Sequence, residues 1–379
     1  MVHGHSPSQD ERFMRQALAL ALRARGFTSP NPMVGAIVVR NGRVVGQGFH
    51  RRAGLAHAEA QALRRAGRSA RGATLYVTLE PCNHTGRTPP CCDAILAAGI
   101  KRVVAAAQDP NPLVNGRGLA RLRRAGVRVT TGVLAEASKR LNAPFWKTMT
   151  HGLPWVVAKV GQSLDGKIAT VSGESRWITS PASRQVTHRL RALVDAILVG
   201  SRTVRADDPL LSARGVRHRA GFPVKVLLEG SRALPTEMRC LSAQSPAPVW
   251  IATARAQARR APAASAAAPE RISFPSKNGR VPLRRLLREL SRRGIQSVLI
   301  EGGGEVLGEA FADKLVDHVV WFTAPLIIGG RAAPSSVAGE GVKYLNQAAR
   351  LTGVTYSRLG VDLCLEADVE YPSARYPKS

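Results

Sequence analysis

Cysteines, aromatic residues and long apolar runs are all scarce in this chain. It holds 5 cysteines in 379 residues, and aromatic residues make up 5% of it. So few cysteines do not form a disulfide framework. No apolar run reaches the roughly 18 residues that a membrane-spanning helix requires. The first residues lack the basic and then apolar regions of a signal peptide. We therefore expect a cytoplasmic protein with reduced thiols and no membrane partner.

Negative charge is also scarce, because 55 Lys and Arg residues face 26 Asp and Glu residues and leave a net charge of +29. Such a balance raises the question of a nucleic-acid partner. However, the basic residues are spread along the whole chain, and no basic run alternates with the aromatic residues that a base-stacking surface needs. We expect no specific nucleic-acid partner and a basic surface that attracts phosphorylated small molecules.

The overall composition is that of an ordinary globular protein, with 44% apolar and 21% charged residues. The length predicts roughly two to three domains. Residues 1–147 alternate helical and strand patterns, which favours an α/β/α sandwich. The expected strands include 34–39, 44–49, 74–79, 102–107 and 127–130, with a hairpin at Asn41-Gly42. The expected helices include one capped by Asp10, one around 60–65, one from about Cys91 and one near 119–124.

Four side chains in this first part carry the chemistry of a hydrolytic zinc site. His57, Cys82 and Cys91 are typical zinc ligands, and Glu59 lies two residues after the histidine. Zinc held by three protein ligands keeps its fourth position for water and lowers the pKa of that water to about 7. The carboxylate of Glu59 can then carry protons to a leaving amine. The pattern predicts a zinc-dependent deaminase.

The local geometry decides which residues of this motif can converge. Neighbouring residues on a helix point about 100° apart, so only one of Cys91 and Cys92 reaches the metal, and we choose Cys91. His57 and Glu59 can face one cavity if His57 caps the helix with non-helical dihedral angles. A closed structural zinc site would need a fourth ligand, which His84 or Cys92 could supply. The same domain offers Asn31, His50 and His84 to hold a pyrimidine ring.

The wide spacing of the two cysteines, with eight residues between them, is similar to one family in particular. The segment 78–92, which reads TLEPCNHTGRTPPCC, resembles the deaminase half of the bifunctional riboflavin-biosynthesis deaminase/reductases. Segments 161–169, 172–180, 199–209 and 300–304 resemble the reductase half of the same family. The resemblance implies a cytidine-deaminase-like domain over 1–147 and a dihydrofolate-reductase-like α/β domain over 153–379. Residues 253–280 match poorly and are expected to form a flexible insertion.

In the second domain the residues themselves indicate less. Trp155–Val160 reads as a buried strand, and 298–300 reads as a strand that leads through Gly302, Gly303 and Gly304 into a helix. Glycines at a helix start let backbone amides approach a phosphate group, but a strand-to-helix turn without a ligand has the same pattern.

The resemblance assigns these positions to the binding of NADPH and a sugar phosphate. The cofactor-binding residues that it implies are Gly161, Trp177, Thr203, Asp207, Gly302, Gly303 and Gly304. The substrate-binding residues are Ser175, Arg191, Leu211, Arg214 and Glu301. Lys159 and Asp207 are both candidates for the general acid of the reduction, and the choice between them stays open.

The resemblance implies two successive reactions. Zinc-dependent deamination of a diaminopyrimidinone that carries ribose 5-phosphate is followed by NADPH-dependent reduction of the ribosyl group to ribityl. One alternative is a nucleoside or tRNA deaminase with a basic, RNA-binding second domain. Another is a metal-binding scaffold without catalysis. A homo-oligomer is compatible with the sequence.

Overall fold

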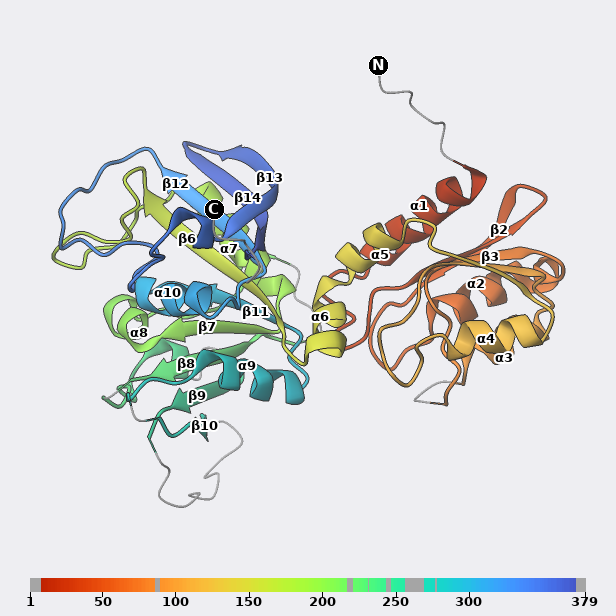
Figure 1. Cartoon of the computed structure of the whole chain (residues 1–379), viewed down its shortest axis with the longest axis horizontal. Coiled ribbons are helices and arrows are strands. Elements are labelled where there is room, and N and C mark those ends of the chain that lie inside the picture. Colours follow the sequence, from red (N-terminus) through yellow and green to blue (C-terminus); the bar gives the residue numbers. More distant parts are fainter. Residues whose placement is uncertain are drawn as a thin grey trace. The chain divides into compact units, whose positions relative to one another are not determined.

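The computed structural model describes residues 8–85, 89–216, 221–230, 232–242, 247–255, 269–276 and 278–372. The chain divides into two compact units, Met1–Gly152 and Leu153–Ser379 (Figure 1). Each unit is an α/β structure built on one sheet, as the sequence pattern predicts. Among the described residues no helix is long and apolar enough to cross a membrane.

The first unit is built on a five-stranded sheet with the order β2-β1-β3-β4-β5. The hairpin β1–β2 turns at Asn41-Gly42, where both residues adopt positive φ. β1 also pairs with β3 antiparallel, and β3, β4 and β5 are parallel. The carboxyl ends of β3 and β4 therefore lie side by side. The strands are β1 (Gly35–Arg40), β2 (Arg43–Phe49), β3 (Thr74–Leu79), β4 (Arg102–Ala107) and β5 (Arg128–Thr131).

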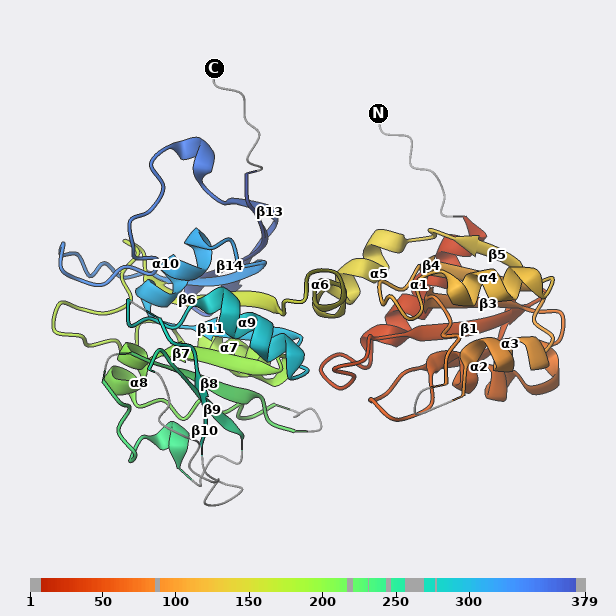
Figure 2. The same ribbon diagram turned by 60° about the horizontal axis from the view of Figure 1, so that its bottom comes forward.

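Helices cover both faces of this sheet (Figure 2). Alternate residues of the central strands point to opposite sides, so the strands read as continuous apolar runs. Ala36 and Val38 of β1 pack toward α2, α3 and α4, whereas Ile37 and Val39 pack toward α1. The helices are α1 (Gln9–Leu22), α2 (Ala58–Ala66), η1 (Gly67–Ala70), α3 (Cys91–Ala97), α4 (Arg117–Arg124), α5 (Ala135–Leu141) and α6 (Ala143–His151).

The prediction that Asp10 caps the first helix is wrong. Ser8 is the N-cap residue of α1, and its hydroxyl accepts a hydrogen bond from the Glu11 amide. Asp10 lies in the first turn, where its carboxylate accepts hydrogen bonds from Arg102 and from the Tyr76 hydroxyl. Serine and aspartate are both favoured at an N-cap, but here Asp10 pairs with the distant Arg102 and Ser8 is the cap.

The first unit also extends past the predicted boundary at 147, because α6 continues to His151.

The second unit is built on a nine-stranded sheet with the order β10-β9-β8-β7-β11-β6-β12-β14-β13. The strands from β10 to β12 are parallel, and the hairpin β13–β14 adds two antiparallel strands at one edge. The strands are β6 (Trp155–Ser163), β7 (Ala196–Gly200), β8 (Val224–Glu229), β9 (Val249–Thr253), β10 (Glu270–Ser273), β11 (Ser297–Glu301), β12 (His318–Ala324), β13 (Arg350–Leu359) and β14 (Asp362–Glu370).

Two apolar cores lie on the opposite faces of this sheet. α9 and α10 contribute to one core, and α7 and α8 contribute to the other. The helices are α7 (Pro181–Leu193), α8 (Ser201–Asp207), η2 (Arg239–Leu241), α9 (Leu283–Arg292), α10 (Gly304–Ala312) and η3 (Leu345–Gln347).

The expected flexible insertion over 253–280 is wrong in part. Residues 270–273 form β10, which pairs in parallel with β9 and buries Ile272. Phe274, just after the strand, is also buried. Residues 256–268 and 277 lie outside the described part of the chain. Ile272 and Phe274 are buried apolar side chains, which explains why residues 270–273 form a strand.

Candidate functional site

The carboxyl ends of the parallel strands and the start of α2 bring the predicted zinc ligands together. The ligand atoms of His57, Cys82 and Cys91 all lie within 4.8 Å of one another. The His57 Nδ1 atom lies 3.2 Å from the Cys91 sulfur and 3.6 Å from the Cys82 sulfur. One imidazole and two thiols at this spacing match a zinc site with three protein ligands.

The local structure explains how each ligand is delivered. His57 caps α2 with extended dihedral angles (φ −67°, ψ 162°), as the sequence predicts. Cys82 follows β3, and Cys91 is the first residue of α3. The neighbouring Cys92 is fully buried, and its sulfur contacts the carbonyl groups of Pro81 and Gly118. Cys92 therefore points into the core and not into the ligand cluster.

The hydrogen bond between the two thiols of the cluster shifts their pKa values in opposite directions. A hydrogen bond from Cys91 lowers the pKa of the Cys82 thiol to about 4, whereas the same bond and burial raise the pKa of Cys91. The Cys91 amide also donates to the Cys82 sulfur at 3.3 Å. The lowered pKa of Cys82 favours its thiolate, the form in which cysteines bind metal. The donor set fits zinc.

Glu59 lies beside this cluster and is only 3% exposed. Burial is the largest cause that raises its pKa above the usual value of a carboxylic acid. A raised pKa suits a group that must both accept and release a proton near neutral pH.

His50 and Asn31 lie next to the cluster, whereas His84 is exposed. The His50 ring stands edge-on to the His57 ring, with centroids 5.4 Å apart. Its Nε2 atom lies 3.1 Å from the Asn31 amide nitrogen. Burial lowers the pKa of His50 and favours the neutral ring. The structure therefore brings two of the three predicted ring-binding residues together and leaves His84 on the surface.

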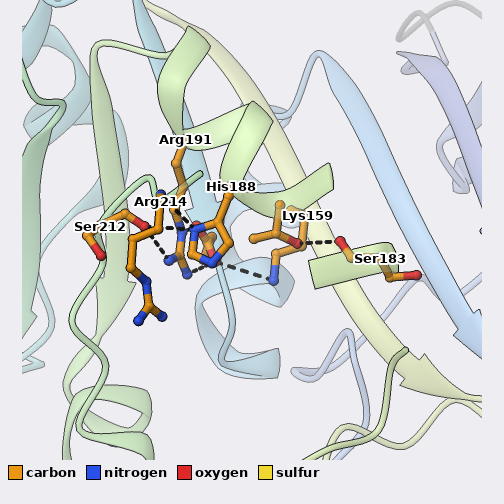
Figure 3. Close-up of polar contacts among 8 residues, drawn as sticks. Lys159, Ser183, His188, Arg191, Ser212 and Arg214 are labelled. Carbon is orange, nitrogen blue, oxygen red and sulfur yellow. Dashed lines mark hydrogen bonds and ion pairs between the residues drawn. The ribbon is translucent and has the colours of Figure 1, made fainter. Parts of the chain in front are cut away.

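In the second unit, the buried Glu301 carboxylate pairs with two other predicted residues, Lys159 and Arg191, which are labelled in Figure 3. Arg191 donates two hydrogen bonds to the Glu301 carboxylate, at 2.5 and 2.8 Å, and the Lys159 ammonium lies 3.3 Å from it. Burial by itself would raise the pKa of Glu301, but the two cations lower it to about 2. Arg191 thus already has a carboxylate partner. Its assignment to the sugar-phosphate substrate stays a prediction.

The other predicted substrate-binding residues are Arg214, Leu211 and Ser175. The Arg214 side chain is exposed, and in Figure 3 its guanidinium extends away from the Arg191 group. Leu211 is buried and adopts φ 52°, a strained backbone for this residue type. Such strain is frequent at ligand sites. Ser175 donates a hydrogen bond to Asp207 at 2.7 Å.

His188 is one residue of this cluster that sequence reasoning missed. Its Nδ1 atom lies 3.0 Å from the Ser212 carbonyl oxygen, to which Arg191 also donates. It stands three residues before Arg191 on α7, and this helical spacing is the signal that could have found it.

The glycine run lies between β11 and α10, as predicted. Gly302 and Gly303 adopt φ 79° and 80°, and Gly304 is the first residue of α10. A Cβ atom on Gly303 would lie 3.3 Å from the Thr203 hydroxyl, so Thr203 packs against this turn. The turn places backbone amides at a helix start, which suits a phosphate group.

Gly161 and Trp177 mark a second part of the expected cofactor site. A Cβ atom on Gly161 would lie 3.1 Å from a Thr179 methyl group. Trp177 is 69% exposed, and the Arg184 guanidinium stacks on its ring at 4.5 Å. A hollow of about 420 Å³ beside Trp177 is lined by Thr179 and Pro325, among others. An exposed aromatic ring beside a hollow is suited to stacking with a planar ligand.

Comparisons with known proteins match both units. The cytidine and deoxycytidylate deaminase zinc-binding region matches residues 7–107, and the RibD C-terminal domain matches residues 154–365. The riboflavin biosynthesis protein RibD of Escherichia coli is 40% identical over 368 residues, which cover 94% of this chain and 98% of that protein. The protein of the same name from Bacillus amyloliquefaciens is 41% identical, with 94% and 96% covered.

Solved structures agree over nearly the whole chain. Acinetobacter baumannii RibD superposes with a TM-score of 0.84 at 36% identity, and the match covers 96% of this chain and 99% of that chain. A diaminohydroxyphosphoribosylaminopyrimidine deaminase/5-amino-6-(5-phosphoribosylamino)uracil reductase from Thermotoga maritima gives a TM-score of 0.82 at 36% identity, with 95% and 99% covered. The likeness therefore includes both units.

Proposed function

The chain belongs to the RibD family of bifunctional deaminase/reductases of riboflavin biosynthesis, and on that premise we propose which of its side chains serve each reaction. The protein is an enzyme with a zinc-dependent deaminase and an NADPH-dependent reductase activity on a pyrimidine substrate. We assign deamination to the first unit, residues 1–147 with the end of α6, and reduction to residues 153–379. The substrate is a diaminopyrimidinone that carries ribose 5-phosphate.

In the deaminase, His57, Cys82 and Cys91 would hold the zinc ion. Zinc, when bound, supplies an activated water for hydrolysis. Glu59 accepts a proton on its carboxylate and delivers it to the amine as the carbon–nitrogen bond breaks. A carbon–oxygen bond forms at the same carbon, and ammonia leaves. This assignment rests on a buried carboxylate that lies beside one imidazole and two thiols. The ligand atoms of the imidazole and the two thiols are all within 4.8 Å of one another.

Binding of the pyrimidine ring falls to the residues next to the cluster. The neutral ring of His50 and the amide of Asn31 can each donate or accept a hydrogen bond, which suits the mixed donor and acceptor edge of an aminopyrimidinone. His84 is exposed on the segment that follows Cys82 and would reach only the outer part of the substrate.

In the reductase, NADPH, when bound, supplies the hydride. Gly302, Gly303 and Gly304 offer backbone amides to its phosphates, while Gly161, Trp177, Thr203 and Asp207 complete its site. Ser175, Leu211 and Arg214 would hold the sugar phosphate, whose charge suits the exposed Arg214 guanidinium.

Lys159 is the better candidate for the general acid of the reduction. It carries protons that can be transferred to the ribose oxygen as the ring opens. The Glu301 carboxylate lies 3.3 Å from the Lys159 ammonium and also pairs with the Arg191 guanidinium. The ion pair with Glu301 therefore orients Lys159. Asp207 instead accepts a hydrogen bond from the Ser175 hydroxyl at 2.7 Å, so its carboxylate already has a binding role.

The alternative of a nucleoside or tRNA deaminase with an RNA-binding second domain is not favoured, because the family match covers both units.

We also propose that the enzyme is cytoplasmic and forms a homodimer through β13. This edge strand exposes Leu351 and Tyr356, and unpaired edges with apolar side chains invite pairing. A light-scattering mass of 40.5 kDa, that of a single chain, would contradict the dimer.

Separate assays of the two reactions test the assignment of Glu59. We expect Glu59→Gln to keep its zinc and to lose ammonia release by about 100-fold or more, since general acid–base catalysis contributes about 10² to 10⁴. Oxidation of NADPH with supplied deaminated intermediate should be unchanged. Glu136→Gln, which alters a carboxylate with 76% of its side chain exposed, is the matched control and should leave both rates unchanged. Normal ammonia release by Glu59→Gln would refute the assignment.

A further inference from the structure

Glu80 is a buried carboxylate that none of the steps above uses. It is the first residue after β3, it is 4% exposed, and it stands two positions before the ligand Cys82. Both of its oxygens accept hydrogen bonds from backbone amides. Oε2 accepts from Asp109 at 3.1 Å and Gly116 at 2.8 Å, and Oε1 accepts from Gly118 at 3.0 Å and Leu119 at 3.3 Å.

These amides belong to the start of α4 and to the segment that leads into it from β4. α4 begins at Arg117, and its N-cap residue Gly116 has no side chain to satisfy the first amides. The Glu80 carboxylate fulfils this role from another strand, and a negative charge at a helix start is stabilised by the helix dipole. Because both oxygens are used in this way, Glu80 is not itself a metal ligand.

α4 in turn contacts the residues that flank both cysteine ligands. A Cβ atom on Gly118 would lie only 2.0 Å from the Pro81 carbonyl oxygen, so the helix backbone packs directly against the residue before Cys82. Arg121 of α4 donates to the Asn83 side chain at 2.7 Å, and it also forms an ion pair with Asp93 of α3. Contacts with α4 therefore fix the residues before and after Cys82. The ion pair with Asp93 also connects α4 to α3, which begins with Cys91.

We propose that Glu80 is a positioning residue of the deaminase, which fixes Cys82 relative to Cys91 by anchoring both to α4. The inference rests on the proposed zinc site. Residues that orient metal ligands without touching the metal typically change metal affinity by about 10- to 100-fold when replaced. A carboxylate with four amide donors has little freedom to shift, so the backbone of Pro81 and Cys82 is held in one position.

Glu80→Gln is the sharpest variant, because it keeps the shape and replaces one acceptor oxygen by an NH₂ group. That group would face two amide donors and lose their hydrogen bonds. We expect zinc affinity, measured by competition with a chromophoric chelator, to fall by about 10- to 100-fold. We also expect the visible absorption of the Co²⁺-substituted protein to change in its thiolate-to-metal bands. Reduction of supplied intermediate should stay at the wild-type rate.

Two further variants keep the test decisive. Glu136→Gln serves as the matched carboxylate control and should bind zinc like the wild type. Arg121→Gln removes the contact with Asn83 and should lower zinc affinity by a smaller factor than Glu80→Gln. If Glu80→Gln does not fold, Arg121→Gln takes its place in the test. Wild-type zinc affinity and Co²⁺ spectra in the folded variants would overturn the inference. A wild-type protein that neither binds zinc nor releases ammonia would instead overturn the proposed deaminase site.

Discussion

At the scale of single residues, the adjacent pair Cys91 and Cys92 separates a functional from a structural thiol. Cys91 contacts His57 and Cys82, whereas Cys92 points into the core between Pro81 and Gly118. We expect Cys91→Ser to lose most of its bound zinc and its deaminase activity. Cys92→Ser should retain zinc, because its side chain points away from the cluster. Zinc content after gel filtration decides between them, and equal loss in both variants would mean that the fold and not the ligand was disturbed.

The ion pair of Glu301 predicts a pH dependence of stability. Its pKa is lowered to about 2 from a usual value of 4.5, so its stabilising effect is complete above pH 4.5 and is lost as the pH falls toward 2. A shift of this size corresponds to about 3 kcal/mol. Urea unfolding of the second unit measures this effect. At pH 6 the free energy of unfolding of the wild type should exceed that of Glu301→Gln, and the difference between the two should shrink between pH 4.5 and 2. A difference that is constant with pH would contradict this account.

At the scale of elements, the contact between β2 and α2 determines where His57 and Glu59 lie. Gly48 of β2 allows this contact, since a Cβ atom there would lie 2.5 Å from the Ala58 carbonyl oxygen in the first turn of α2. We expect Gly48→Ala to destabilise the first unit by about 1–3 kcal/mol through overpacking and to lower zinc affinity. Thermal unfolding with a zinc titration measures both effects.

The matched control for this variant is Gly230→Ala, where the added carbon would lie 3.4 Å from the Ser201 hydroxyl, an ordinary contact distance. This variant should unfold at the wild-type temperature. If Gly48→Ala shows neither effect, the β2–α2 contact does not determine the position of the site.

The elements also show what the sequence can and cannot predict. The bounds of β3 and β4 agree with the predicted strands 74–79 and 102–107, because both strands are buried apolar runs with clear ends. The cap of α1 and the strand β10 were mispredicted, because each depends on partners far along the chain. Glu80 carries no local signal, since its partners are backbone groups 29 to 39 residues away, whereas the helical spacing of His188 and Arg191 is a signal that the sequence does offer.

At the scale of the whole molecule, two α/β units of different topology carry two different sets of polar side chains. The first set is self-evident from the sequence, since an imidazole, two thiols and a carboxylate suffice to indicate zinc hydrolysis. The second set could be assigned only by resemblance, because a glycine turn and scattered arginines have many uses. The structure adds the ion pair of Arg191, Glu301 and Lys159, which no spacing in the sequence indicates.

The net charge of +29 is a property of the whole surface, and it fits a substrate and a cofactor that both carry phosphate. It does not by itself indicate RNA, because the family match leaves no unit unassigned. The basic surface therefore explains attraction of anionic ligands in general, while the named side chains explain the chemistry.

The central claim is that one chain catalyses both reactions in sequence. Mass spectrometry tests it most directly, with the zinc-loaded protein incubated with the diaminopyrimidinone ribosyl phosphate and NADPH. We expect exchange of an amine for oxygen, followed by the addition of two hydrogens. Exchange without reduction would contradict the reductase assignment, and an unchanged substrate would contradict the account as a whole.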